Sequence, residues 1–120
     1  IDESRPMITL YGIPNCDTCR KARKWLDAAG IQHRFYDFRK DGLTAEVVAA
    51  WSAEVGLEKL VNRRGTTWRA LADDQKARLE TAPTALLVEN PTLLKRPVID
   101  LGDRRLVGFD ASVTAALEAA

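Results

Sequence analysis

Two cysteines are the residues of this chain best suited to covalent chemistry, and the chain has no others. Cys16 and Cys19 follow the turn-forming residues Gly-Ile-Pro-Asn and precede a run with helical apolar spacing. A Cys-x-x-Cys pair between a strand and a helix is typical of a thiol-redox site, because helical residues three apart share one face and can form a reversible disulfide. Unpaired N–H groups at the helix start, together with Arg20 and Lys21, favour thiolate over thiol at Cys16. We therefore expect Cys16 to be the nucleophile and Cys19 the resolving thiol.

The cysteine pair has two alternative roles. Both thiols could be buried and unreactive, although the charged residues and the turn beside them argue against that role. A zinc site needs two more ligands at metal-binding spacing, and His33 is the only histidine, so we expect no bound metal. His33 itself is expected to face solvent from a strand, and no Cys-His or Ser-His-Asp arrangement follows from its position.

Three pairs of basic residues could converge on the cysteine loop and hold an anion there: Arg20 with Lys21, Arg63 with Arg64, and Lys95 with Arg96. Guanidinium groups suit this task because they bind carboxylates through two parallel hydrogen bonds. Among these pairs, Arg96 is the more specific indication of a binding site, because Pro97 follows it directly before a predicted strand. A proline there fixes the chain and has no backbone N–H, so a neighbouring strand edge is left open to an extended peptide. Both the cis and the trans form of the Arg96–Pro97 bond are compatible with the sequence. The candidate anion-binding residues are Arg20, Arg63, Arg64 and Arg96.

Length and composition indicate one globular domain. The chain of 120 residues can bury a core without disulfides, and its 46% hydrophobic and 29% charged residues are typical of a soluble protein. The formal net charge of +1 gives no argument for nucleic-acid binding. No apolar run reaches membrane-spanning length and no signal-peptide core is present, so we expect a cytoplasmic protein without a membrane partner. We take residues 7–120 as the domain and residues 1–6 as a flexible lead-in or a cloning remnant.

The order of the expected elements predicts the fold. Strands are expected at residues 7–12 and 32–38 with a helix at 16–29 between them, a βαβ unit whose two strands are parallel. Helices at 44–55, 73–80 and 84–89 follow, then a hairpin of 98–101 and 105–107 and a last helix capped by Asp110. We also expect Asp73 to cap its helix, Asp41-Gly42 to form a turn, and Ala29 to lie on an apolar helix face. These elements predict an α/β, thioredoxin-like fold: a four-stranded mixed sheet with helices on both faces and a helical insertion.

Four stretches of the chain resemble the arsenate reductase/Spx family, also called ArsC-like, and within it the small YffB-like reductases. The resemblance covers nearly all of residues 7–117. Its most specific stretches are Leu-Tyr-Gly-Ile-Pro-Asn-Cys-Asp-Thr-Cys-Arg-Lys-Ala-Arg-Lys-Trp-Leu at 10–26, Asn-Arg-Arg-Gly-Thr-Thr-Trp-Arg at 62–69, Leu-Lys-Arg-Pro-Val at 94–98 and Leu-Val-Gly-Phe at 106–109. The resemblance implies a thioredoxin-like fold with a helical insertion, Cys16 as the catalytic cysteine, and Pro97 as a cis-proline beside the anion-binding Arg96.

The chain departs from arsenate reductases of this family at positions that bear on activity. Those enzymes place three arginines around the cysteine, and only the one that matches Arg96 is clearly retained. Asn62 falls at the first position, and Gly108-Phe109-Asp110 stands where the third arginine is expected. Fewer cations at an oxyanion site weaken the case for arsenate turnover. Cys19, which those arsenate reductases lack, resembles the Cys-x-x-Cys switch of Spx-type transcription regulators.

The residues and the resemblance together predict an oxidoreductase that acts through thiols. We expect glutathione as the co-substrate, glutaredoxin as a candidate partner, and no bound cofactor. Two alternatives stay open. One is an Spx-like regulator that binds the RNA polymerase α subunit and is switched by the two cysteines. The other is an arsenate reductase that depends on glutathione and glutaredoxin.

Overall fold

The computed structural model of the chain describes residues 8–119. Residues 1–6, for which a lead-in was predicted, and the predicted strand start at Met7 lie outside the described residues, as does Ala120. The described chain divides into two compact units. Unit 1 runs up to Phe38 and resumes at Arg96, and unit 2 is Arg39–Lys95. The single domain predicted over residues 7–120 stays a prediction, because compact units can belong to one domain.

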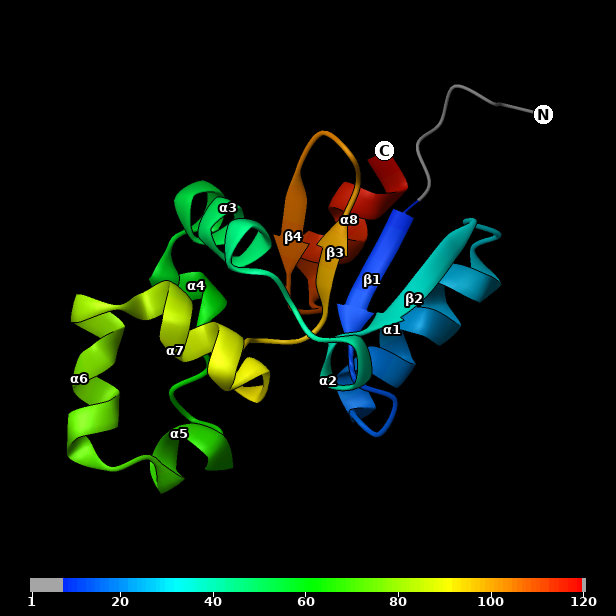
Figure 1. Ribbon diagram of the computed structural model, residues 1–120. Helices are drawn as coiled ribbons and strands as arrows, with labels where there is room; N and C mark the ends of the chain where they lie inside the picture. The colour runs from blue at the N-terminus through cyan, green and yellow to red at the C-terminus, as the bar shows by residue number, and fades with distance from the viewer. Residues whose placement is uncertain (1–7, 120) are drawn as a thin grey trace. The chain divides into compact units, whose positions relative to one another are not determined.

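A four-stranded mixed sheet forms the centre of unit 1 (Figure 1). Its strands are β1 (Ile8–Gly12), β2 (His33–Asp37), β3 (Val98–Asp100) and β4 (Arg105–Val107), in the order β2-β1-β3-β4. β1 pairs with β2 in parallel and with β3 antiparallel, and β3 and β4 form an antiparallel hairpin. These pairings confirm the predicted α/β class, the thioredoxin-like mixed sheet and the parallel βαβ unit.

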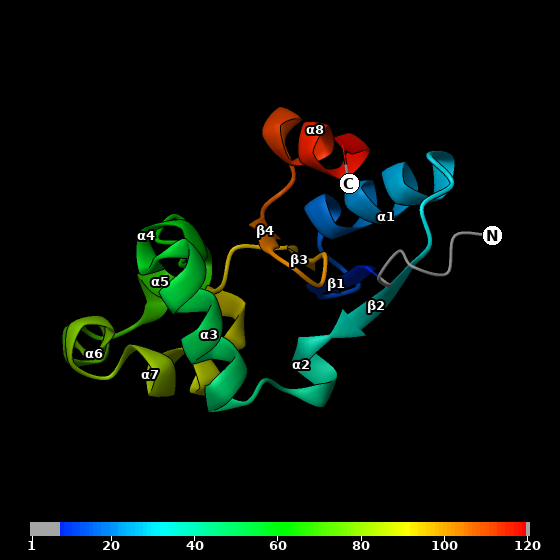
Figure 2. The same cartoon turned by 90° about the horizontal axis from the view of Figure 1, so that it is seen from above.

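Two helices of unit 1 cover the same face of this sheet (Figure 2). They are α1 (Asp17–Ala28) and α8 (Ala111–Ala119). α1 ends before Gly30, whose positive φ of 71° stops the helix. α8 begins with the predicted cap, since the Asp110 carboxylate accepts a hydrogen bond of 3.0 Å from the Val113 N–H. Alternate strand residues and one stripe of each helix meet in a single core: Ile8, Leu10, Ala22, Leu26, Ile99, Leu101, Val113 and Leu117.

Unit 2 is the predicted helical insertion between β2 and β3, and it is confirmed. Its longest helix, α3 (Ala45–Val55), begins as predicted at Thr44, whose hydroxyl accepts a hydrogen bond from the Val47 N–H. Both α3 and α6 pack against α7. The one-turn helix α2 (Phe38–Asp41) begins at the last residue of the first segment of unit 1 and continues into unit 2. The other helices of unit 2 are α4 (Leu57–Leu60), α5 (Thr66–Ala70), α6 (Asp73–Thr81), α7 (Pro83–Glu89) and the 3-10 helix η1 (Pro91–Leu93).

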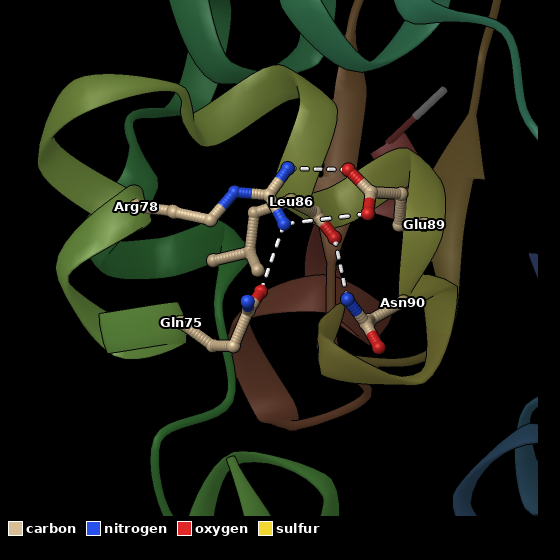
Figure 3. A network of polar contacts seen from close by, with 5 residues as sticks. All are labelled: Gln75, Arg78, Leu86, Glu89 and Asn90. Atoms are coloured by element: carbon tan, nitrogen blue, oxygen red, sulfur yellow. Dashed lines mark hydrogen bonds and ion pairs between the residues drawn. The ribbon is translucent and has the colours of Figure 1, made fainter. Parts of the chain in front are cut away.

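A polar network joins α6 to α7 (Figure 3). The Arg78 guanidinium contacts both carboxylate oxygens of Glu89 and donates to the Gln75 side chain at 2.8 Å. At the end of α7 the Asn90 side-chain amide donates to the Leu86 carbonyl at 3.1 Å. Because a fork of two N–H groups fits a carboxylate, the Arg78–Glu89 ion pair links the two helices in addition to their packing.

Local predictions that proved wrong have identifiable causes. The strand predicted at 32–38 ends at Asp37, because Phe38 begins the helix α2, and Asp73 is the first residue of α6, whose N-cap is Ala72. Ala29 is exposed, because it lies past the last residue of α1, at the C-cap. Among the helices of residues 8–119, none has the length and apolar character needed to cross a bilayer.

Candidate functional site

The cysteine loop links the end of β1 to the start of α1. Cys16 is the N-cap of α1, with extended backbone angles of φ −101° and ψ 123°. Its N–H donates to the Ile13 carbonyl at 3.4 Å, and its own carbonyl accepts the first helical hydrogen bond from the Arg20 N–H at 3.0 Å. The predicted position of the nucleophile at a helix start is therefore what the structure has, and Cys16 is half-buried.

Cys19 lies one turn further on and points into unit 1. It has no exposed surface, and both cysteines are free thiols. Its sulfur lies so close to the end of β1 that a Cβ atom on Gly12 would be 2.4 Å from Sγ. Gly12 is not at a positive φ, so its role here is the space that it leaves and not its backbone freedom. The Cys19 thiol is thus fixed between the helix and the strand.

The surroundings of Cys16 favour its thiolate. Burial raises the pKa, but hydrogen bonds from the N–H and the thiol of Cys19, the charge of Arg96 and the Thr18 N–H together lower the pKa below the ordinary 9.0. Because a thiolate is a far stronger acceptor than a thiol, these N–H groups at the start of α1 favour ionisation of Cys16.

Cys19 has the opposite tendency. Burial is the largest cause that raises the pKa of Cys19, and the hydrogen bond to Cys16 and the negative charge of Cys16 raise it further, to about 12. The hydrogen bond from the Ile13 N–H lowers this pKa, but by less. Cys16 is therefore the more acidic thiol of the pair, and as the pH rises the thiolate forms at Cys16 before it forms at Cys19. Because only a thiolate attacks, this difference in acidity bears on which cysteine reacts first, and the roles of Cys16 as nucleophile and Cys19 as resolving thiol stay predictions.

Arg96 and Pro97 precede β3 and belong to the same unit as the cysteines. The Arg96–Pro97 peptide bond is cis. The Pro97 carbonyl accepts a hydrogen bond of 2.8 Å from the Gly108 N–H, and the next residue, Val98, pairs with Tyr11 on β1. The Arg96 charge lowers the pKa of both thiols, so this arginine acts on the site electrostatically. Of the four candidate arginines, Arg96 is the one with a described electrostatic effect on Cys16.

Arg20 lies on α1 and is exposed. Its guanidinium is 3.5 Å from the Asp17 carboxylate, and the two side chains keep 54% and 88% of their exposure. An ion pair this exposed is largely screened by water and holds the side chain weakly. The role of Arg20 in binding an anion stays a prediction.

Arg63 and Arg64 belong to unit 2, in the turn between α4 and α5. The Asn62 side-chain oxygen accepts a hydrogen bond of 3.1 Å from the Arg64 N–H and shapes this turn. The Arg63 guanidinium lies 5.7 Å from the centre of the Trp68 ring, a cation–π contact. Both side chains are exposed. Their participation in a site with Cys16 stays a prediction.

His33 does not face solvent as predicted. Its side chain keeps 10% of its exposure, with Nε2 3.8 Å from an Asp27 carboxylate oxygen and Nδ1 3.0 Å from the Ile31 carbonyl. The end of α1 and the turn after it cover this strand position. Among the side chains of residues 8–119, no group of three or more His, Cys, Asp or Glu is placed to hold a metal ion.

Sequence reasoning missed two parts of the site. Gly12 makes room for the Cys19 sulfur, and the Ile13 N–H donates a hydrogen bond to it. The glycine just before the Ile-Pro-Asn turn was read only as a turn former. A signal was available, because a glycine at the end of a strand often marks a close approach of another group.

A profile of the ArsC family matches residues 11–117, nearly the whole chain. The chain belongs to the ArsC family. An uncharacterised protein of Haemophilus influenzae is 46% identical over 87% of this chain and 92% of its own length. The global transcriptional regulator Spx of Streptococcus agalactiae is 32% identical over 87% of this chain and 77% of its own length.

Solved structures of this family have the same fold. The structure of the YFFB protein matches with a TM-score of 0.85 and 43% identity, covering 92% of this chain and 97% of that one. A solution structure of an arsenate reductase (ArsC) related protein from Brucella melitensis matches with a TM-score of 0.74 and 38% identity, covering 96% and 97%. The resemblance to ArsC, Spx and YffB proteins that the sequence motifs indicated is confirmed.

Proposed function

We propose that this ArsC-family protein is a reductase that acts on disulfides through Cys16 and Cys19. The observation that carries the proposal is the unequal acidity of two thiols in hydrogen-bond contact. The pKa of one lies below 9.0, and that of the other is about 12. A nucleophile and a reserve thiol with these properties are what a two-step thiol–disulfide exchange requires.

In the first step the Cys16 thiolate attacks one sulfur of a substrate disulfide. A new S–S bond forms, the old one breaks, and the departing thiolate takes a proton from water. In the second step Cys19 loses its proton to water and attacks the Cys16 sulfur, which releases the second substrate thiol and leaves a Cys16–Cys19 disulfide. Two glutathione thiols then reduce this disulfide and become oxidised glutathione.

The first step itself prepares the second. Both the hydrogen bond to Cys16 and the negative charge of Cys16 raise the pKa of Cys19. Once Cys16 is bonded to a substrate sulfur it carries no charge, so these two causes disappear and only burial still opposes ionisation of Cys19. The resolving thiol is therefore held inactive until the mixed disulfide exists.

Glutathione suits this site as the co-substrate because it carries two carboxylates. Arg96 acts electrostatically at Cys16, and Arg20 is held only by an exposed ion pair. We propose that these two arginines bind the carboxylates of glutathione, and the anion-binding roles of Arg63 and Arg64 stay predictions from the sequence. Glutaredoxin is a candidate partner for the same exchange, and the expected setting is the cytoplasm, where a glutathione pool is maintained.

Mass spectrometry of the protein treated with oxidised glutathione tests this proposal. The expected result is a lasting glutathione adduct on Cys16 in the Cys19→Ser variant, a Cys16–Cys19 disulfide without adduct in the unmodified protein, and no adduct in the Cys16→Ser variant. An adduct on Cys19 but never on Cys16 would overturn the assignment of nucleophile and resolving thiol.

A second function is favoured by the 32% identity to Spx. In that alternative the Cys16–Cys19 disulfide switches binding to RNA polymerase. A pull-down with the polymerase α subunit under oxidising and reducing conditions separates the two functions, because a reductase shows no redox-dependent retention. A third alternative, an arsenate reductase, predicts consumption of arsenate with glutathione and glutaredoxin, and Asn62 and Gly108 in place of arginines argue against it.

A further inference from the structure

Helix α1 carries an unusual distribution of charge. Four basic residues stand between positions 20 and 24, and its last turn has none. The positive end of a helix dipole lies at the N-terminus, so cations stabilise a helix near its C-terminus and not in its first half. Arg20 is also three and four residues from Arg23 and Lys24, spacings at which like charges repel. The dipole effect falls off within the first turn, and Asp27 stands at attractive spacings from Arg23 and Lys24, so the position of Arg20 is the part of this arrangement that helix stability does not explain.

Four of the charged residues form one surface feature, which we call the basic strip: Arg20, Arg23, Lys24 and Asp27. They line a shallow depression of about 220 Å³. The Arg23 guanidinium lies 4.5 Å from the centre of the Phe35 ring, which anchors it toward β2. The strip begins one helical turn after Cys16, since the Arg20 N–H donates to the Cys16 carbonyl.

We propose that the basic strip is a docking surface for an acidic segment of a partner protein whose disulfide reacts at Cys16. The inference rests on the proposed function and deepens it by naming a substrate class. A chain bonded to Cys16 through sulfur and laid along α1 meets Arg20 first and then Arg23 and Lys24. Carboxylates on that chain replace the exposed Asp17 partner of Arg20 and relieve the repulsion within the strip.

The dimensions and charges of the strip favour a protein segment over other anions. The depression, at about 220 Å³, is smaller than the 300–1,000 Å³ of typical small-molecule sites, which favours side chains of a longer chain over a separate small molecule. Asp27 ends the strip with a negative charge, and the chain as a whole carries a formal charge of only +1. A nucleic acid would bring phosphates past Asp27, whereas a short acidic segment stops before it.

The test uses two peptides that carry the same cysteine, activated as a neutral thiopyridyl disulfide. One peptide has three glutamates beside the cysteine, and the other has three glutamines. Release of thiopyridone measures the second-order rate constant at Cys16. We expect the acidic peptide to react several times faster at low salt, with the preference lost near 0.5 M salt, because screening removes interactions between exposed charges.

Variants then assign the preference to the strip. Arg23→Gln and Lys24→Gln should each lower the preference for the acidic peptide about twofold, the effect in water of one unit charge roughly 8 Å away. Arg104→Gln is the matched control. It removes one exposed cation from the β3–β4 turn, which lies at the opposite end of the sheet because β3 runs antiparallel to β1. The glutamine peptide should react equally with all these proteins.

The outcomes separate this proposal from the proposed function. If neutral dithiodipyridine fails to react at Cys16, the reductase proposal itself fails. If dithiodipyridine reacts but the two peptides react alike, or Arg104→Gln lowers the preference as much as Lys24→Gln, the docking surface is refuted. Equal reaction of the peptides together with Lys24-dependent binding of an oligonucleotide would also refute it and assign the strip to nucleic acid.

Discussion

Replacing Gly12 with alanine should destabilise the protein through Cys19. The new Cβ atom would lie 2.4 Å from the Cys19 sulfur, whereas ordinary van der Waals contact begins at 3.4 Å, so one of the two atoms must move by about 1 Å. Neither can move freely, because Cys19 is buried in α1 and Gly12 is paired in β1. Overpacking of this kind costs about 1–3 kcal/mol, offset by the roughly 0.4–1 kcal/mol that alanine contributes by restricting the unfolded chain.

Urea unfolding of four proteins measures this effect: the unmodified protein, Gly12→Ala, Cys19→Ala and the double variant. We expect Gly12→Ala to lower the free energy of unfolding by about 1–2 kcal/mol. The cost should vanish in the Cys19→Ala background, where the other contacts of the Cβ are an ordinary 3.5 Å. Gly65→Ala is the control, since its Cβ would meet the movable Asn62 amide at 2.9 Å. An equal cost of Gly12→Ala in both backgrounds would refute the steric account.

Three further predictions concern ionisable side chains of the described residues. Arg96→Gln should raise the pKa of Cys16, measured as the pH midpoint of its alkylation, because one of the groups that favour the thiolate is lost. Folding raises the pKa of Cys19 to about 12, so the stability contributed by its neutral thiol is fully present below the pKa of the unfolded thiol and is lost as the pH rises toward 12. Urea unfolding at alkaline pH should show that Cys19→Ala lessens this loss of stability. Arg78→Ala should increase hydrogen exchange of α7 amides, since it removes the contacts with Glu89, with Lys59→Ala on another helix as the control.

Much of the fold was predictable because its long elements carry clear periodicity. α1, α3 and the β3–β4 hairpin have apolar spacing and turn residues that agree with each other, and sequence reasoning placed them within about two residues. The one-turn helix α2 was not predictable in this way. Four residues cannot show a helical period, and so short a helix is stable only through its surroundings, here with Phe38 fully buried.

The site was predictable where chemistry is local to the sequence. Cys16 at a helix start and Cys19 one turn later follow from the motif, and so does the anion-binding candidate Arg96. The raised pKa of Cys19 did not follow, because its largest cause is burial, and the glycine that leaves room for the buried sulfur lies seven residues earlier, on a strand. The burial of His33 was missed for a similar reason, since its cover comes from Asp27 and Ile31 at the end of α1.

The pH dependence of alkylation at each cysteine, read by mass spectrometry of the native protein, tests the central claim most directly. Limiting iodoacetamide should modify Cys16 alone, with a midpoint below the ordinary thiol pKa of 9.0, while Cys19 stays unmodified until the protein unfolds. Modification of Cys19 before Cys16, or a Cys16 midpoint at or above 9.0, would contradict the assignment of Cys16 as the activated nucleophile.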